Sequence, residues 1–165
     1  MQKRSLSILV DNTPGTLSRI AGLFSRRGYN IDSITAGVTA DDRFTRMTVV
    51  CSGDEQILEQ ITKQLAKLVD VRDIKVLEPD SSVLRELILV KVSARPDQRQ
   101  GIISIADVFR AKVVDVANDS LTVEMTGTQS KLEAFIALMG DYQILELART
   151  GITGLSRGSD DVRYL

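Results

Sequence analysis

The stretch DNTPGTLSRI, which follows the first apolar run of the chain, contains the residues whose types and spacing best suit ligand binding. Asn12 and Thr13 are typical N-cap residues, and Pro14 suits the first helical position because its missing N–H would have no partner there. Gly15 and Thr16 would follow with backbone amides that lack intrahelical acceptors. A small carboxylate or phosphate could approach them closely because Gly15 has no side chain. Taken alone, the stretch is explained more simply by a well-capped helix that binds nothing.

Residues that could perform catalysis are scarce in the rest of the sequence. The 165 residues include no histidine, which excludes Ser-His-Asp and Cys-His catalysis and the usual transition-metal sites. The pairs Asp41–Asp42 and Asp160–Asp161 lie in a turn and in a polar tail, where solvated loops are the simpler interpretation. The sequence has neither a Walker loop nor a G-x-G-x-x-G motif. We therefore expect no catalytic residue, no metal site and no cofactor on this chain.

The charge balance and the few aromatic residues argue against nucleic acid as a partner. The chain has 21 basic and 22 acidic residues, with a net charge of −1, whereas proteins that bind the phosphate backbone carry a basic surface. A ferredoxin-like sheet that binds RNA stacks bases on exposed aromatic side chains, but the corresponding strand RFTRMTVVC contains Phe44 alone. The sequence therefore predicts a protein that does not bind nucleic acid.

Signals for membrane insertion or secretion are not found either. No apolar run approaches the roughly 20 residues of a membrane-spanning helix. The opening MQKRSLSILVDN has too short an apolar segment, and no small-residue cleavage site, for a signal peptide. We expect a cytoplasmic protein that contacts no membrane. Its single cysteine, Cys51, ends a strand-like run and is expected to be a buried thiol.

Hydrophobic periodicity predicts a β-α-β-β-α-β unit in the first half of the chain. The predicted strands lie at 5–10, 30–38, 47–51 and 71–77, and the apolar stripes of the two predicted helices lie at 17–24 and 57–68. Gly28 can take the left-handed conformation that ends the first helix. Right-handed crossovers place both helices on one face of a four-stranded antiparallel sheet, which is the ferredoxin-like sandwich.

The same order of elements returns in the second half, after the linker-like residues EPDSS. Strands are predicted at 86–92, 112–116, 121–125 and 142–148, with helical stripes at 102–109 and 132–139. The expected fold class is α+β, with two ferredoxin-like sandwiches in tandem at 1–78 and 84–165, joined by a linker at 79–83. Ile88, Val90 and Val92 are expected on the sheet face away from the helices, where such apolar residues would form an interface.

Several stretches of the sequence together resemble one protein family. DNTPGTLSRIAGLFSRRGYNIDSITAG resembles the opening of the small, regulatory subunit of acetolactate synthase (acetohydroxyacid synthase), whose N-terminal unit is an ACT domain. The resemblance continues through RMTVVCSGDEQILEQITKQLAKLVDV, RELILVKV, DVFRAKVVDV and ARTGITGLSRG, so it covers nearly the whole chain. ACT domains in general share the Pro-Gly-like helix start, whereas GLFSRRGYNIDS and TGITGLSRG point to this subunit.

The resemblance implies a non-catalytic subunit that activates a separate, large catalytic subunit of acetolactate synthase. It also implies feedback inhibition by a branched-chain amino acid, usually valine, in valine, leucine and isoleucine biosynthesis. Thiamine diphosphate, Mg²⁺ and FAD are expected on the catalytic partner. The alternative is a stand-alone ACT-type regulator that binds an amino acid and controls another enzyme.

In that family two ACT domains join their sheets edge to edge as a homodimer, and the effector lies at their junction. Carried onto this sequence, the effector-binding residues are Asn12, Gly15 and Thr16 of one subunit with Asn30 and Ile31 of the other. Thr16 stands where the family often has alanine, so the resemblance leaves the preferred effector open.

Overall fold

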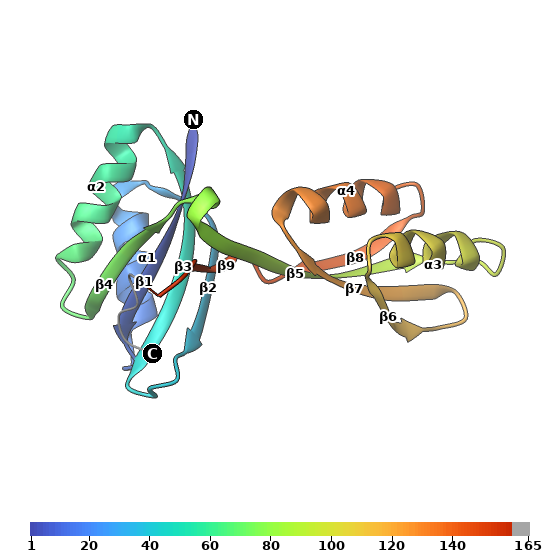
Figure 1. Ribbon diagram of the computed structural model, residues 1–165, viewed down its shortest axis with the longest axis horizontal. Coiled ribbons are helices and arrows are strands. Elements are labelled where there is room, and N and C mark those ends of the chain that lie inside the picture. Colours follow the sequence, from blue (N-terminus) through green and yellow to red (C-terminus); the bar gives the residue numbers. More distant parts are fainter. Residues whose placement is uncertain (160–165) are drawn as a thin grey trace. The chain divides into compact units, whose positions relative to one another are not determined.

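Residues 1–159 are described by the computed structural model, and their strands and helices follow the predicted order twice (Figure 1). The chain forms two units. One consists of Met1–Leu84 together with the segment that starts at Ile152, and the other consists of Arg85–Gly151. The predicted α+β fold with two tandem β-α-β-β-α-β units is confirmed.

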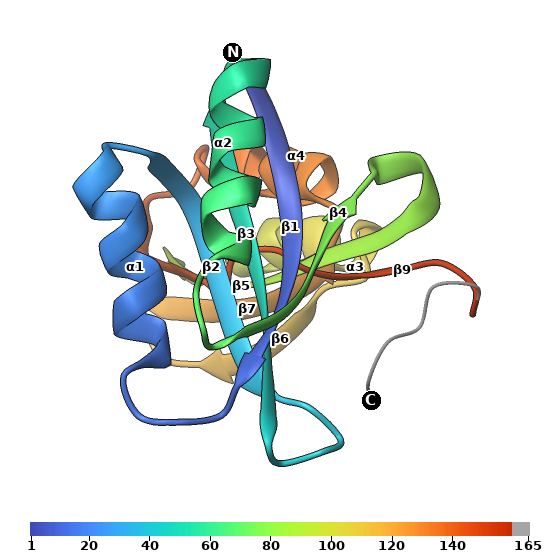
Figure 2. The ribbon, with the colours of Figure 1, turned by 90° about the vertical axis from the view of Figure 1, so that its left-hand side faces the viewer.

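The first unit is built on a four-stranded antiparallel sheet with the strand order β2-β3-β1-β4. Its elements are β1 (Gln2–Asp11), α1 (Thr16–Arg27), β2 (Asn30–Val38), β3 (Phe44–Gly53), α2 (Glu55–Ala66) and β4 (Val71–Leu77). Figure 2 shows both helices in front of this sheet. Because strand side chains alternate between faces, one set packs against the apolar stripes of the helices. This core contains Leu6, Ile8, Val10, Ile20, Phe24, Met47, Val49, Cys51, Leu58, Ile61 and Leu65.

One end of each helix follows the local sequence signal. Gly28 ends α1 in the left-handed conformation, with φ of 67°, and its amide donates to carbonyl groups in the last turn. Asp54 caps α2, because its Oδ1 accepts a hydrogen bond from the Ile57 amide at 2.8 Å. The end of α1 and the start of α2 are therefore set by residues of the predicted kind.

The other face of this sheet is covered by a strand from the far end of the chain. Strand β9 (Thr153–Ser156) pairs with the strand that starts at Ser82 and also contacts β3 and β4, and Figure 1 shows it on the opposite side of the sheet from the helices. On this face the sheet carries the polar side chains of Ser7 and Thr48, 3% and 2% exposed, and the apolar side chains of Leu9 and Val50, 1% and 5% exposed. The face that no helix covers is therefore partly apolar, and its side chains are buried.

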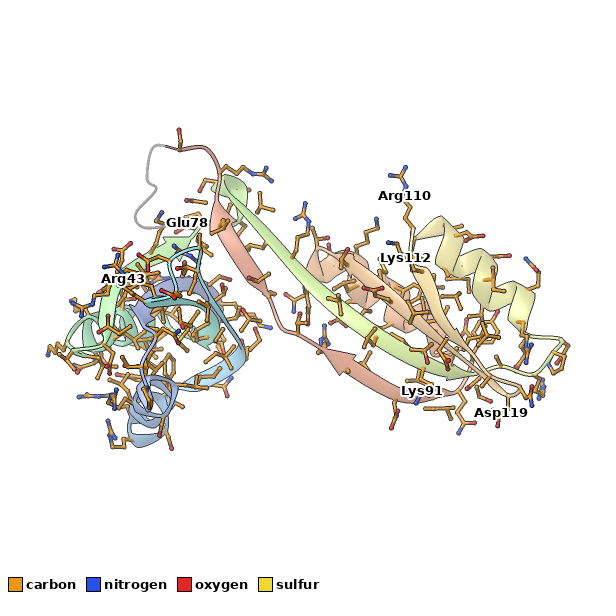
Figure 3. All side chains as sticks on the ribbon, turned by 90° about the horizontal axis from the view of Figure 1, so that it is seen from below. Arg43, Glu78, Lys91, Arg110, Lys112 and Asp119 are labelled. Carbon is orange, nitrogen blue, oxygen red and sulfur yellow. The ribbon has the colours of Figure 1, made fainter. Side chains whose placement is uncertain are left out.

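The second unit repeats the arrangement with the strand order β6-β7-β5-β8. Its elements are β5 (Ser82–Ser93), α3 (Arg99–Val108), β6 (Lys112–Val116), β7 (Ser120–Gly127), α4 (Gln129–Met139) and β8 (Ile144–Arg149), preceded by a short 3-10 turn at Pro79–Ser81. After α3, Arg110 turns the chain with a φ of 57°, and its side chain projects outward (Figure 3). The left-handed turn directs the chain back into β6.

The prediction that Ile88, Val90 and Val92 face away from the helices is wrong. All three are 0% exposed and belong to the core beneath α3 and α4. In ELILVKV, strand β5 has apolar residues on both faces, so alternation alone did not determine which of the two sets of side chains points toward the helices. A shift of one residue exchanges the two faces. The outer face instead carries Leu89 and Lys91, and the Nζ atom of Lys91, labelled in Figure 3, lies 2.8 Å from Glu146 Oε2.

The division into units also differs from the expected one. A linker was expected at 79–83, but Pro79–Ser81 forms a helical turn and β5 starts at Ser82. The expected second unit ran to the C-terminus, whereas β9 belongs to the first unit. The reason is that β9 packs on a sheet face that no helix covers. The second unit is therefore inserted into the first, and the chain passes between them twice.

Candidate functional site

The loop between β1 and α1 differs in detail from its prediction. The helix starts at Thr16 rather than at Pro14, and the N-cap is Gly15, with φ of 85° and no side-chain capping bond. Asn12 and Thr13 were the expected N-caps, but both lie ahead of the cap. The left-handed conformation at Gly15 favours glycine. No side chain caps the amides at the helix start, although the Thr16 amide donates to the Thr13 carbonyl oxygen at 3.4 Å. Amides without a side-chain cap are what an anion site requires.

Asn12 holds this loop in place with both ends of its amide side chain. Its Nδ2 donates to the Asp42 carbonyl oxygen at 2.9 Å, and its Oδ1 accepts from Thr45 Oγ1 at 3.2 Å. Its backbone amide also donates to the Arg43 carbonyl oxygen at 2.8 Å. Asn12 is thus tied to the β2–β3 turn, and its Oδ1 keeps one further acceptor position.

Thr16 is a structural residue of this loop. It is 5% exposed, and its Oγ1 lies 3.2 Å from the Asp11 carbonyl oxygen, to which it donates, and 3.0 Å from Thr13 Oγ1. A hydroxyl that bridges the end of β1 and the loop fixes the position of the first helical turn. Alanine at this position could not make these bonds.

An ion pair next to Gly15 was not identified from the sequence. Arg19 Nε lies 2.5 Å from Asp70 Oδ2, and Arg19 Nη2 lies 3.0 Å from Asp70 Oδ1. The hydrogen bond from Arg19 holds the pKa of the Asp70 carboxyl below its usual range. A Cβ atom built on Gly15 would lie 2.8 Å from Arg19 Nη1. The helix start therefore carries a fixed guanidinium beside its amides. The spacing of Gly15 and Arg19 by four residues could have indicated this neighbour, whereas Asp70 had no sequence signal.

Asn30 and Ile31 lie at the start of β2. Asn30 Nδ2 donates to Asp32 Oδ1 at 2.7 Å and to Ser52 Oγ at 3.3 Å. Within the described part of the chain, the Asn30 side-chain oxygen has no hydrogen-bond partner. Ile31 is partly buried against the core of the first unit. Asp32, which the sequence did not single out, adds a carboxylate beside Asn30, and its Oδ2 lies 3.9 Å from the ammonium group of Lys3.

One chain does not bring the two groups of predicted site residues together. Asp11 pairs with Phe44 at the start of β3, and Asn30 pairs with Ser52 at its end. The eight-residue offset along β3 corresponds to about 26 Å at roughly 3.3 Å per residue. Asn12, Gly15 and Thr16 therefore lie at one end of the sheet, and Asn30 and Ile31 at the other.

The remaining candidates for chemistry have structural explanations. Asp41 pairs with Arg43 Nη2 at 2.5 Å, and the hydrogen bonds from Arg43 lower the pKa of Asp41 to about 2. The pair Asp160–Asp161 lies outside the described residues. Cys51 is 0% exposed, as predicted, and its burial raises the pKa of the thiol to about 11. The described residues contain no cluster of potential metal ligands and no helix able to span a membrane.

Two family descriptions match this chain. Residues 6–73 match an ACT domain of the acetohydroxyacid synthase small subunit type, and residues 85–158 match the small subunit of acetolactate synthase. The probable acetolactate synthase small subunit of Archaeoglobus fulgidus is 49% identical over 95% of this chain and 98% of its own length. The isozyme 3 small subunit of Salmonella typhimurium is 46% identical over 98% of this chain and 99% of its own length.

A solved structure shows the same similarity. The crystal structure of the acetolactate synthase small subunit from Thermotoga maritima is 38% identical to this chain and superposes with a TM-score of 0.89. The match covers 96% of this chain and 99% of the Thermotoga chain. The chain therefore belongs to the family of acetolactate synthase small subunits, the regulatory, non-catalytic subunits of that enzyme.

Proposed function

We propose that this chain activates a large, thiamine-diphosphate-dependent catalytic subunit of acetolactate synthase and makes it sensitive to a branched-chain amino acid, valine first among them. Thiamine diphosphate, Mg²⁺ and FAD would be bound by the large subunit, and this chain would bind only the effector. The observation that carries the proposal is the separation of the two groups of site residues at opposite ends of one sheet, next to an edge strand.

A two-fold pairing of β2 strands would complete the site. Strand β2 is an edge strand, centred on Ile34, and Val38 at its end is 59% exposed. In an antiparallel pair centred on Ile34, Asn30 of the partner subunit lies opposite Val38. Val38 is at the end of the sheet to which Asn12 ties the first loop. The geometry supports two equivalent sites, each made by two subunits.

The groups that would meet there match the chemistry of an amino acid. The uncapped amides after Gly15 and the guanidinium of Arg19 attract a carboxylate, and the oxygens of Asn30 and Asp32 accept from an ammonium group. Burial of an isopropyl group against Ile31 contributes about 1.5 to 3 kcal/mol, and the helix terminus adds about 0.3 to 2 kcal/mol. Net binding of a few kcal/mol corresponds to dissociation constants on the order of millimolar to tens of micromolar.

The test is a reconstituted assay of acetolactate formation from pyruvate. We expect no turnover by this chain alone, increased turnover when it is added to the large subunit, and inhibition of the mixture by valine but not of the large subunit alone. Titration with valine, leucine and isoleucine identifies the effector. Turnover by this chain alone, or no change in the large subunit's activity, would refute the proposal.

A further inference from the structure

The segment Ile152–Ser156, here called the strap, is seated firmly on the non-helical face of the first unit's sheet. Its side chains alternate, with Ile152 9% exposed and Leu155 59% exposed. Gly154 faces inward and has no space for a side chain. A Cβ atom there would lie 3.0 Å from the Val83 carbonyl oxygen and would overlap a methyl group of Leu84. The strap is therefore packed against neighbouring backbone and is not a loose tail.

The strap spans the sheet from one edge strand to the other. At β2, Thr35 Oγ1 donates to the Ile152 carbonyl oxygen at 3.1 Å. At β4, Lys75 Nζ donates to Ser156 Oγ at 3.3 Å. Thr35 lies next to the centre of β2, the strand that would pair with its copy in the dimer. The position of the strap therefore depends, through Thr35, on the position of β2, the edge strand to which the proposed effector site belongs.

The strap also continues directly into the second unit. Ile152 follows Gly151, the last residue of that unit, which adopts a φ of 83°. Thr35 is therefore linked to the boundary of the second unit through one hydrogen bond and one peptide bond. A change in β2 that shifts Thr35 acts on the Ile152 carbonyl, because a buried carbonyl that loses its donor is destabilised.

We propose that the Thr35–Ile152 hydrogen bond couples occupancy of the effector site at the β2 edge to the second unit. The inference rests on the proposed function, since it assigns a route for the same regulation. Thr35 is a positioning residue in this scheme and does not contact the effector. A coupling free energy between two sites requires an element whose position both sites influence. The strap is such an element, because Thr35 of β2 contacts it and the second unit is joined to it at Gly151.

Three variants separate this coupling from effects on folding. Thr35→Val removes the hydroxyl at nearly constant volume, and Thr35→Ser keeps it. Ser33→Ala is the matched control, because Ser33 points to the same face of β2 and its buried Oγ has no hydrogen-bond partner in the described structure. Each variant is compared with wild type by calorimetric titration of the isolated subunit with valine and by inhibition of the reconstituted enzyme.

We expect Thr35→Val to raise the half-inhibitory valine concentration by about two- to ten-fold, as the loss of one hydrogen bond predicts, while Kd for the isolated subunit changes by less than about two-fold. Thr35→Ser and Ser33→Ala should behave as wild type in both measurements. Unchanged inhibition in Thr35→Val would overturn the inference, as would an equal loss of direct binding. Failure of the wild-type subunit to bind any branched-chain amino acid would instead refute the proposed function.

Discussion

Gly15 combines two constraints that no other residue type meets together. Its φ of 85° favours glycine, and the space where a Cβ atom would lie is next to Arg19 Nη1. No side chain at position 15 covers the backbone amides at the helix start, and no side chain caps them. This position therefore offers the most direct test of the site at the scale of a residue.

Gly15→Asp should abolish inhibition by valine and leave activation of the catalytic subunit largely intact. The new carboxylate would pair with Arg19 and satisfy the helix amides, and it would repel the effector carboxylate by about 1 kcal/mol in water and about 4 kcal/mol at an effective dielectric of 20. Affinity should fall about ten- to a thousand-fold. The left-handed conformation costs about 1 kcal/mol of stability. Inhibition curves of the reconstituted enzyme measure the effect.

Gly158→Asp is the matched control for backbone strain. Gly158 has a φ of 73°, and nothing lies within 4 Å of its missing Cβ atom. This variant should lose a similar amount of stability and keep wild-type inhibition. If a folded Gly15→Asp subunit kept wild-type sensitivity to valine, the effector site would not lie at this helix start.

Asp70→Asn should lower the thermal stability of the subunit in a pH-dependent way. The pKa of Asp70 is lowered in the folded state by the hydrogen bond from Arg19, so its contribution is present above the unfolded pKa of about 4 and is lost as the pH falls through the lower folded value. The difference in Tm between wild type and variant should therefore be largest near pH 7 and shrink below about pH 4. A difference in Tm that does not depend on pH between 3 and 7 would contradict this role.

Among the elements, β2 is the strand through which we expect two copies of the chain to pair. It is an edge strand with an exposed backbone, and such edges are usually protected or paired in native proteins. Pairing of β2 with β2 of a second subunit would protect this edge and would at the same time complete the proposed effector site. Dimerisation and effector binding should therefore depend on the same side chains at the ends of β2.

Val38→Glu should weaken both dimerisation and effector binding by at least about ten-fold. Val38 is 59% exposed in the single chain, but pairing of β2 strands would surround its side chain, and an unpaired carboxylate buried there costs several kcal/mol. Analytical ultracentrifugation measures the dimer and calorimetry measures the effector. Val69→Glu, at a position 83% exposed in the turn before β4, is the control and should remain dimeric. Equal dimerisation of the two variants would exclude β2 as the interface.

The elements that the sequence predicted well are those with one apolar face. The helical stripe of α2 and the alternation in β1 and β3 led to the correct sheet and core. The predicted stripe of α1 was right for Ile20 and Phe24, whereas Leu17 is 54% exposed. Prediction was weaker where alternation was absent, as in β5, and at the start of α1, where Asn12 is tied to the β2–β3 turn instead of capping the helix. Strand β9 was not predicted, because its partners lie far away in sequence and its own pattern is short.

For the candidate site, the residue types could be predicted and their surroundings could not. The sequence pointed to Gly15 at the helix start, where the structure has no side-chain cap and the Thr16 amide donates to the Thr13 carbonyl oxygen at 3.4 Å. The Arg19–Asp70 pair and the Thr35–Ile152 bond depend on contacts across 51 and 117 residues. Such contacts leave no local signal in a single sequence.

The whole molecule consists of one unit inserted into another, and this arrangement predicts which truncations fold. Replacement of residues 85–151 by a short Gly/Ser linker should leave a stable first unit, since Gly154 and Leu84 are already in contact. Residues 1–84 alone lack the strap over Ser7 and Thr48 and should melt at least about 4 °C lower, as a loss of about 1 kcal/mol predicts for a domain of this size. Circular dichroism melting curves compare the two. Equal melting temperatures would mean that the strap does not stabilise the first unit.

The strap also determines when the first unit can finish folding during synthesis. Strands β1 to β4 leave the ribosome well before Ile152, which lies 117 residues after its partner Thr35. At about 5 to 20 residues per second, the interval between Thr35 and Ile152 lasts on the order of ten seconds. During this time the sheet face that carries Leu9 and Val50 beside Ser7 and Thr48 is exposed to water, and Thr35 on the edge strand β2 lacks its partner. Two chains emerging from neighbouring ribosomes could pair their β2 edges before either strap is in place, so the proposed dimer would assemble before its subunits are complete.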